Sequence, residues 1–212
     1  MSNKSQEQFE KNGYCLVQSA ISNELRDVIT QYALFDEMQN FSPEDYATAQ
    51  VANAHSKYAD PAMESLLLLL HPIMEEATGL KLYPTYSYYR VYRNGDDLKT
   101  HKDRESCEIS CTLCFNYSYD DNKFKWPIIM DGNSVALNPG DMVAYRGCEL
   151  DHHRDKFEYP EDAWHVQGFF HYVDANGPYA SFKYDKRNII GEILQKSPMI
   201  PQTKQSYITF TK

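Results

Sequence analysis

The chain has 212 residues, of which 42% are hydrophobic and 24% are charged, and its formal net charge is −9. A chain of this length can form one globular domain whose core needs no disulfide or structural metal. The acidic balance argues against nucleic acid as a non-specific partner, because a phosphate backbone requires a basic surface. The longest apolar run covers only residues 66–70, too short to cross a bilayer, so no membrane association is expected.

Cysteine usage and the N-terminal sequence bear on location. The five cysteines are an odd number, and no basic segment followed by a long apolar stretch marks a secretory signal near the N-terminus. Thiols in such a chain are expected to stay reduced. The sequence therefore favours a cytoplasmic protein.

The first part of the chain predicts two helices and a short strand. Tyr14–Val17 is an apolar run after Gly13 and is typical of a strand. Ser22 precedes a helix whose apolar residues recur at helical spacing, and residues 41–60 are polar and irregular. A second helix is expected over Pro61–Thr78, because proline suits its first turn and the glycine that follows suits its C-terminal cap.

From Gly79 onward the pattern changes to short strands separated by turns. The turns contain Asn94-Gly95, Asp131-Gly132 and Asn138-Pro139-Gly140, which are strong turn sequences. Short strands at such spacing are typical of a sandwich, barrel or jelly roll, not of alternating βαβ units. We therefore expect a single, mainly β domain with flanking helices. Its predicted strands cover residues 82–93, 107–117, 126–130, 134–137, 142–146 and 165–173.

His101-Lys102-Asp103 and a later histidine form the pattern with chemical meaning. On a strand, residues two positions apart point to the same face, so His101 and Asp103 are expected to project together. An imidazole beside a carboxylate supplies two ligands of the facial triad that binds non-haem Fe(II). The third ligand is expected from His152, which follows the strand over residues 142–146 that Gly140-Asp141 opens. The neighbouring His153 stays an alternative, because only one of two adjacent residues in an extended segment can face the metal.

These residues resemble a known family. Residues 86–103, Cys107-Glu108-Ile109-Ser110, residues 140–147 and His152 resemble the prolyl-4-hydroxylase-like branch of the 2-oxoglutarate/Fe(II)-dependent dioxygenases, which includes small bacterial and phage members. Gly13-Tyr14 before a helix is similar to the helical support of that superfamily. The resemblance extends to about residue 178 and is more specific for the superfamily than for the substrate.

The resemblance implies a double-stranded β-helix, a jelly roll of the cupin type, with iron at its open end. It implies one dioxygenase domain over residues 1–212, made of an N-terminal helical support (1–80), the β-helix core (81–178) and a C-terminal extension (179–212). His101, Asp103 and His152 would hold Fe(II), leaving positions for 2-oxoglutarate and dioxygen. The implied reaction hydroxylates an unactivated C–H bond of a prolyl or other peptide residue, or of a small molecule, while 2-oxoglutarate is decarboxylated to succinate.

The site expected for the distal carboxylate of 2-oxoglutarate departs from the family pattern. The family places an Arg or Lys on the last core strand, but residues 164–173 contain neither. Arg154, on the same strand face as His152, is the first candidate, and His165 is the next. The Tyr92 hydroxyl, on the strand before His101, would bind the same carboxylate. We therefore predict Tyr92 and Arg154 as the cosubstrate ligands, because a guanidinium matches both carboxylate oxygens.

Two other interpretations of these residues are weaker. Cys107, Cys111 and Cys114 have the spacing of a radical-SAM iron–sulfur motif, but a strand would send Cys111 and Cys114 to opposite faces, so buried thiols are the better interpretation. A cupin-type metal-binding protein or isomerase without 2-oxoglutarate chemistry would use the same core and ligand types. Such a protein would usually show further His or Glu ligands in its first motif. The remaining histidines, namely His55, His71 and His171, are expected to be structural or exposed, and the oligomeric state is left open.

Overall fold

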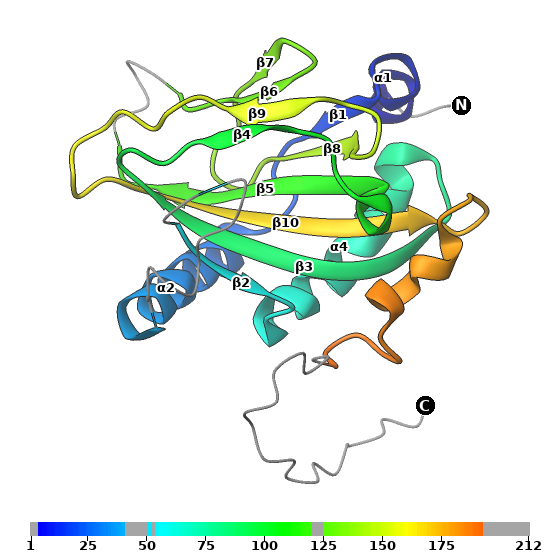
Figure 1. The fold of residues 1–212 in the computed structure, drawn as a ribbon, viewed down its shortest axis with the longest axis horizontal. Helices are drawn as coiled ribbons and strands as arrows, with labels where there is room; N and C mark the ends of the chain where they lie inside the picture. The colour runs from blue at the N-terminus through cyan, green and yellow to red at the C-terminus, as the bar shows by residue number, and fades with distance from the viewer. Residues whose placement is uncertain (1–3, 41–50, 52–53, 120–124, 193–212) are drawn as a thin grey trace, which may run out of the picture.

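Two antiparallel β-sheets face each other and form the body of the molecule (Figure 1). The computed structural model describes residues 4–40, 51, 54–119 and 125–192. The larger sheet has six strands in the order β1-β8-β5-β10-β3-β2, and the smaller sheet has four in the order β4-β9-β6-β7. Facing antiparallel sheets with crossovers make a jelly roll, so the predicted mainly β fold is confirmed. The strands are β1 (Tyr14–Val17), β2 (His55–Tyr58), β3 (Leu82–Arg93), β4 (Leu98–His101), β5 (Ile109–Tyr117), β6 (Ile128–Met130), β7 (Asn133–Val135), β8 (Met142–Arg146), β9 (His152–Arg154) and β10 (Trp164–Asp174).

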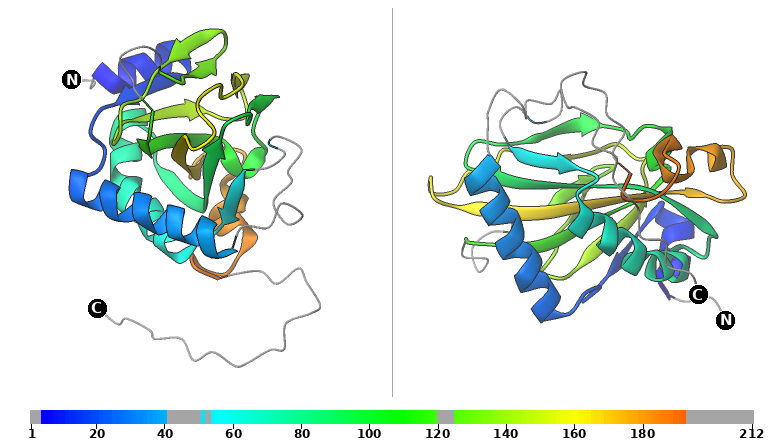
Figure 2. Two further views of the ribbon diagram at one scale, coloured as in Figure 1. Left: turned by 90° about the vertical axis from the view of Figure 1, so that its left-hand side faces the viewer. Right: turned by 90° about the horizontal axis from the view of Figure 1, so that it is seen from below.

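Helices cover the outer face of the larger sheet. Figure 2 shows α2 (Asn23–Asn40) and α4 (Pro61–Thr78) on the same side of this sheet, and α1 (Lys4–Asn12) packs beside β1. The helix α1 was not expected from the sequence, because Phe9 is its only buried residue and it therefore lacks an apolar stripe. Two short turns of 3₁₀ helix, η1 (Glu105–Cys107) and η2 (Ala180–Lys186), complete the described elements.

The bounds of α4 agree with the prediction, and its capping contacts explain them. The Asp60 carboxylate accepts a hydrogen bond from Ala62 N at 3.0 Å, and Pro61 occupies the first turn, where no N–H partner is needed. Gly79 ends the helix with a φ of 74°, a left-handed conformation that glycine adopts without a steric penalty. The predicted strand over residues 107–117 begins instead at Ile109, because η1 includes Cys107.

The pleat of the strands divides the side chains of the larger sheet between two cores. On β3, Tyr89 lies in the apolar core beneath the helices, whereas Tyr92 lies in the core between the sheets. On β5, Cys111 lies on the helix side and Cys114 on the inter-sheet side, so their predicted opposite orientation is confirmed. This arrangement excludes one metal cluster that uses both thiols.

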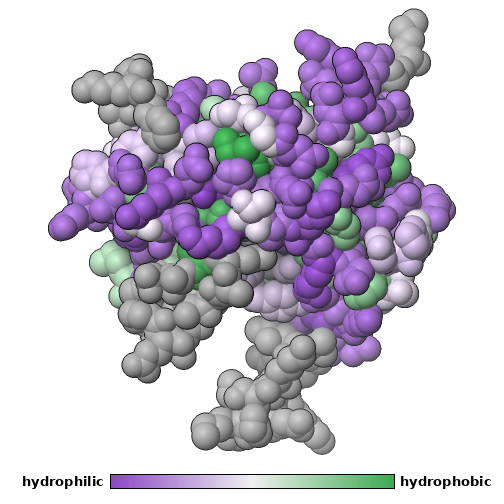
Figure 3. Space-filling view, turned by 45° about the horizontal axis from the view of Figure 1, so that its top comes forward, coloured by the Kyte–Doolittle hydropathy of each residue, from purple (hydrophilic) through white to green (hydrophobic). Residues whose placement is uncertain are grey.

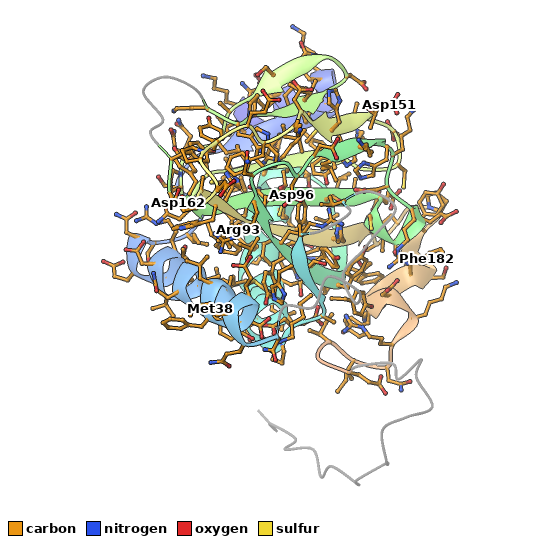
Figure 4. The ribbon with its side chains drawn as sticks, turned by 60° about the vertical axis from the view of Figure 1, so that its left-hand side comes forward. Met38, Arg93, Asp96, Asp151, Asp162 and Phe182 are labelled. Carbon is orange, nitrogen blue, oxygen red and sulfur yellow. The ribbon has the colours of Figure 1, made fainter. Side chains whose placement is uncertain are left out.

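A C-terminal segment crosses the end of the larger sheet near β2 and β3. It begins with η2, and Figure 4 shows Phe182 of this turn at the end of the molecule away from Arg93. Arg187 donates a hydrogen bond to Glu64 Oε2 at 2.9 Å, and the two side chains form a buried ion pair. Residues 193–212, the rest of the predicted extension, lie outside the described residues, and so do residues 41–50 of the predicted irregular stretch. The division of the chain into three regions stays a prediction.

Three consecutive residues of this segment have left-handed backbone conformations. Tyr184, Asp185 and Lys186 have φ values of 57°, 53° and 62°. Each such residue costs about 1–2 kcal/mol when it is not glycine, so other contacts must hold the segment in place. Asp185 provides them, because it accepts two hydrogen bonds from Arg104 at 2.9 Å each and one from Tyr58 at 2.7 Å.

The surface is largely polar. The face shown in Figure 3 is mostly hydrophilic, with small apolar areas between polar side chains. Among the described residues, no helix combines the length and the apolar character that crossing a membrane requires.

Packing of α4 on the larger sheet can be tested with two adjacent leucines. Leu67 is 0% exposed and Leu68 is 50% exposed. Leu67→Ala should lower the free energy of unfolding by about 2–5 kcal/mol, because it leaves a cavity in the core. Leu68→Ala should change that free energy by less than about 0.5 kcal/mol. Urea unfolding followed by circular dichroism measures both, and equal losses would contradict the described orientation of α4.

Candidate functional site

A cavity of about 370 Å³ lies between the two sheets. Its wall includes the three predicted metal ligands, His101, Asp103 and His152, together with Arg90 and His171. Cavities that combine apolar surface with a few converging polar groups are the usual form of small-molecule sites. The cavity is therefore the place in the described structure where chemistry is expected.

The three predicted ligands meet in the wall of this cavity. Antiparallel pairing of β4 with β9 sets His101 opposite His152, and their ring centroids are 4.2 Å apart. The Nε2 atom of each ring lies 3.6 Å from Oδ1 of Asp103. A metal ion with bonds of about 2.0–2.2 Å to nitrogen and oxygen fits between atoms at this separation. The three side chains can therefore bind one ion.

Backbone carbonyls fix the tautomer of both histidines. His101 Nδ1 lies 2.7 Å from Lys99 O, and His152 Nδ1 lies 3.0 Å from Leu150 O. A carbonyl oxygen only accepts, so each Nδ1 carries a proton, and each Nε2 is the ring atom directed at Asp103. Metal-bound histidines are held by this kind of second hydrogen bond.

Asp103 was predicted to lie on the same strand as His101, but the structure places it in a loop. The strand β4 ends at His101, so Asp103 lies in the following loop, where its backbone N–H donates to Gly147 O at 2.9 Å. Ser110 Oγ donates to Asp103 Oδ2 at 3.1 Å. Burial raises the pKa of Asp103, but hydrogen bonds with His101 and His152 outweigh it and hold the pKa far below its ordinary value. The carboxylate is thus in the ionised form that binds metal.

The alternative ligand His153 points away from the cavity. On β9, His152 and Arg154 are each 2% exposed, whereas the His153 side chain is 31% exposed. The His153 ring lies 3.7 Å from the carboxylate of Asp155, outside the triad. Strand parity therefore brings His152, and not His153, to Asp103.

The predicted cosubstrate ligands Tyr92 and Arg154 lie together, but neither lines the cavity. The Tyr92 ring and the Arg154 guanidinium both pack on Trp126, with distances to its ring centroid of 4.9 Å and 4.7 Å. Arg154 donates to Trp126 O at 2.6 Å and to Gln167 Oε1 at 3.2 Å. Arg154 Nε is buried without a hydrogen-bond partner among the described residues, and Tyr92 Oη is buried beside Arg90 with no hydrogen bond of ideal geometry. Such donors are unusual in a folded protein and indicate that a ligand or water completes them.

His165, the second candidate for the carboxylate, is poorly suited to bind an anion. Its Nε2 lies 2.7 Å from Gln167 Oε1 and its Nδ1 lies 3.0 Å from Tyr119 Oη, so both ring nitrogens are occupied. Burial, together with the neighbouring charge of Arg154, lowers the pKa of His165 to about 3. The ring is therefore neutral at neutral pH.

Arg90 is a cation in the cavity wall that the sequence analysis missed. It is 5% exposed, and its guanidinium carbon lies 5.0 Å and 5.8 Å from the ring centroids of Tyr88 and Phe169. Burial lowers the pKa of Arg90, but neighbouring Tyr92 and Tyr88 raise it above its ordinary value, so the side chain is charged. The sequence feature that could have predicted its position is the alternation of side chains along a strand, because Arg90 lies two residues before Tyr92 and therefore on the same face of β3.

His171, expected to be structural or exposed, also lines the cavity. Its Nδ1 lies 2.8 Å from Ser110 Oγ, the hydroxyl that also bonds Asp103. The His171 ring packs at 4.5 Å from the Tyr86 ring, and Tyr86 Oη lies 3.1 Å from Cys107 Sγ. Burial lowers the pKa of His171 to about 4, so this imidazole is neutral. A second group of polar side chains thus adjoins the triad.

Comparisons with known proteins agree with this description of the fold. No family model matches the chain, and no curated protein matches it in sequence. Solved structures do match. A prolyl-4-hydroxylase from Pseudomonas putida superimposes with a TM-score of 0.62 and 15% identity, covering 81% of this chain and 98% of that one. EctD from S. alaskensis gives a TM-score of 0.62 and 12% identity, covering 82% of this chain and 78% of that one. HygX from Streptomyces hygroscopicus, solved with nickel and 2-oxoglutarate bound, gives 0.59 and 10%, covering 82% and 88%.

Identities this low show a shared fold and nothing finer. The chain has the double-stranded β-helix fold of the 2-oxoglutarate- and Fe(II)-dependent oxygenases, as the resemblance in its sequence implied. Ligand roles for individual residues remain predictions that rest on the geometry of this chain.

Substitution of Gly147 tests the site without replacing any of the predicted ligand residues. A Cβ at this position would lie 2.2 Å from Cys107 O and 2.5 Å from Asp103 Oδ2, so the loop that carries Asp103 would have to move. Gly147→Ala should weaken Mn(II) binding by about ten- to a hundredfold, the usual effect of disturbing the support of a metal ligand. Calorimetric titration measures this affinity.

The control for that variant is Gly132→Ala. Gly132 has a φ of +78°, and a Cβ added there would meet no atom of the described residues within 4 Å, so alanine adds backbone strain without touching the triad. Gly132→Ala should lower stability and keep the metal affinity. If both variants bind Mn(II) equally well, the close approach at Gly147 does not position Asp103.

Proposed function

We propose that the chain is a non-haem Fe(II)- and 2-oxoglutarate-dependent dioxygenase that hydroxylates an unactivated C–H bond. The observation that carries the proposal is the convergence of His101 Nε2 and His152 Nε2 on Asp103 Oδ1, each at 3.6 Å, in the wall of a cavity. Two imidazoles and one carboxylate on one side of an ion are the ligand set of non-haem Fe(II) oxygenases.

The residues present fit that metal. Both histidines hold Nδ1 against a backbone carbonyl and direct Nε2 at Asp103, and the pKa of Asp103 is held far below its ordinary value, so the carboxylate is ionised and a bound metal would take the place of a proton on Nε2. The ligands come from one side, so an ion held by them has its other side toward the cavity. Bound there, Fe(II) and 2-oxoglutarate would supply the oxidation chemistry, in which 2-oxoglutarate is decarboxylated to succinate as dioxygen is consumed.

The chain itself contributes position, charge and exclusion of water. Hydrogen bonds from the histidines to Lys99 O and Leu150 O fix the ring planes, and the bond from Asp103 N to Gly147 O fixes the loop. These contacts keep the ligands from reorganising during turnover, which is the main protein contribution in such sites. Rings from β3 and β10 line the cavity beside the triad.

The distal carboxylate of 2-oxoglutarate is proposed to lie between Arg90 and the Tyr92–Arg154 pair. Arg154 Nε supplies a buried donor that has no partner among the described residues, Tyr92 Oη lies buried beside Arg90, and Arg90 supplies a cation in the cavity wall itself. A carboxylate satisfies both kinds of group, because charge-assisted hydrogen bonds to guanidinium are among the strongest in proteins. This arrangement replaces the basic residue that β10 lacks.

The oxidised substrate is proposed to be a prolyl or other peptide residue, or a small molecule. Tyr86, Tyr88 and Phe169 give the cavity aromatic surface against which a peptide or a ring can pack. Two proteins of the same fold are named prolyl hydroxylases, one from Pseudomonas putida and one from a Chlorella virus. A cytoplasmic location is also proposed, because all five cysteines are free thiols.

Turnover variants test the triad. His101→Ala, Asp103→Ala and His152→Ala should each abolish Fe(II)-dependent formation of succinate from 2-oxoglutarate, because loss of one ligand weakens metal binding and changes the coordination of the iron. His153→Ala is the matched control and should keep most of the activity, since His153 lies outside the triad. Succinate is measured by mass spectrometry. Loss of activity in His153→Ala with retention in His152→Ala would reverse the assignment.

Binding tests separate this function from that of a cupin-type protein. The Mn(II)-loaded chain should bind 2-oxoglutarate in calorimetry without oxygen, and the apo chain should bind it much more weakly. If the metal binds and 2-oxoglutarate does not, the cupin-type alternative is favoured over the dioxygenase.

Variants of the basic residues test the carboxylate site. Arg90→Met and Arg154→Met should each raise the Kd for 2-oxoglutarate by about ten- to a hundredfold, the cost of losing a charged hydrogen bond. His165→Gln should change that Kd less, because the ring is neutral and already paired. Calorimetry on the Mn(II) form gives all three values. A larger effect in His165→Gln than in both arginine variants would refute the proposed carboxylate site.

A further inference from the structure

A second set of metal-binding side chains adjoins the triad and shares one member with it. Ligand atoms of Asp103, Cys107 and His171 all lie within 4.8 Å of one another. All three residues line the cavity, so an ion that reaches the triad also reaches this set. Nothing in the proposed dioxygenase reaction uses Cys107 or His171 as a ligand.

The donor atoms of this set differ from those of the triad in chemical character. Asp103, Cys107 and His171 offer oxygen, sulfur and nitrogen, whereas the triad offers two nitrogens and one oxygen. Thiolate is a soft ligand that favours Zn²⁺ and related thiophilic cations, and three protein ligands plus one open position is the usual form of a zinc site with exchangeable solvent. The second set therefore suits a different metal from the first.

The surroundings of Cys107 suit a bound thiolate. Cys107 is 2% exposed and His171 is 5% exposed, so neither is an accidental surface group. Tyr86 Oη lies 3.1 Å from Cys107 Sγ and can donate its hydrogen to sulfur, and the Arg104 guanidinium lies 4.8 Å from the Tyr86 ring centroid. Burial and the charge of Asp103 raise the pKa of the Cys107 thiol, while the Tyr86 hydroxyl and Arg104 oppose that rise, so the thiolate forms only when a cation replaces the proton.

The shared carboxylate makes the two sets alternatives to each other. Asp103 Oδ1 faces the two triad histidines, and Asp103 Oδ2 accepts from Ser110, whose hydroxyl also bonds His171. A carboxylate can hold two cations only if each takes its own oxygen, and Asp103 Oδ2 already accepts the hydrogen bond from Ser110. The two sets are therefore expected to compete for Asp103.

We propose that Asp103, Cys107 and His171 form a second, thiolate-containing site for a thiophilic divalent cation such as Zn²⁺, which competes with the metal of the triad for Asp103. Binding replaces the proton of the Cys107 thiol with the metal ion, and that proton leaves to solvent. No electron transfer is involved. Zinc bound to this second set would take Asp103 away from the triad and so release the metal held there.

Cobalt(II) tests the proposal, because a bound thiolate gives it a near-ultraviolet charge-transfer band that imidazole and carboxylate do not. The reduced apo protein titrated with Co²⁺ without oxygen should show this band at one ion per chain. Cys107→Ser and His171→Gln should lose the band. His101→Ala and His152→Ala should keep it, because they alter only the triad.

Cys148→Ser is the matched control and should keep the band, since the Cys148 thiol is half-buried and is no part of the set. Absence of the band at saturating Co²⁺ in both the natural chain and His101→Ala, where the triad no longer competes, overturns the proposal. A band that persists in Cys107→Ser overturns it as well, and so does one lost in His101→Ala, which would join Cys107 to the triad. None of these results depends on 2-oxoglutarate binding, so the proposed function stands or fails separately.

The second site can also be tested on the unaltered chain, so the test does not depend on whether a variant folds. Zn²⁺ should slow alkylation of Cys107 by iodoacetamide at least tenfold, with Cys148 as the internal reference, and peptide mass spectrometry separates the two thiols. Equal alkylation of Cys107 with and without Zn²⁺ would overturn the second site.

Discussion

The register between β4 and β9 is the constraint on which the site depends. Pairing His101 with His152 places the two rings 4.2 Å apart and turns both Nε2 atoms toward one carboxylate. A slip of one residue would bring His153 inward and turn His152 outward, because side chains alternate along a strand. The smaller sheet is short, so this register is held by contacts beyond its own ladder, including the burial of Arg154 against Trp126. The meeting of His101, Asp103 and His152 thus depends on the backbone pairing of β4 with β9.

Charge is distributed unevenly over the molecule. The chain carries a net charge of −9, yet Arg90, Lys102 and Arg104 line the cavity together with the single carboxylate of Asp103. Arg104 is paired with Asp185, and the other cations, Arg90 and Lys102, lie where low-dielectric walls let them attract anions even though the whole protein is acidic. A dianionic cosubstrate would therefore be drawn to this cavity and not to the outer surface. Asp103 itself is kept ionised mainly by its hydrogen bonds with the two histidines.

Sequence patterns predicted those features that local chemistry decides. Helix α4 was found from its capping residues, and β3, β8 and β10 were found from apolar runs bounded by turns. The triad was found because its two halves carry distinctive residue types. The orientation of Asp103 was not predictable, because it depends on a hydrogen bond to Gly147, which is remote in sequence. Alternation of side chains along β3 would have placed Arg90 on the same face as Tyr92. A single sequence, however, does not tell which face of a tyrosine-rich strand lines a cavity. His171 was missed for the same reason.

The C-terminal segment links two regions that the chain order separates. Asp185 holds Arg104, the residue next to Asp103, while Arg187 holds Glu64 inside α4. The left-handed backbone at residues 184–186 stores strain that these contacts offset. Coupling between linked equilibria is reciprocal, so a change that orders the loop around Asp103 through the Arg104–Asp185 contact orders the segment by the same coupling free energy. The conformation of residues 184–187 therefore depends on the loop that carries Asp103, although these residues lie outside the cavity wall.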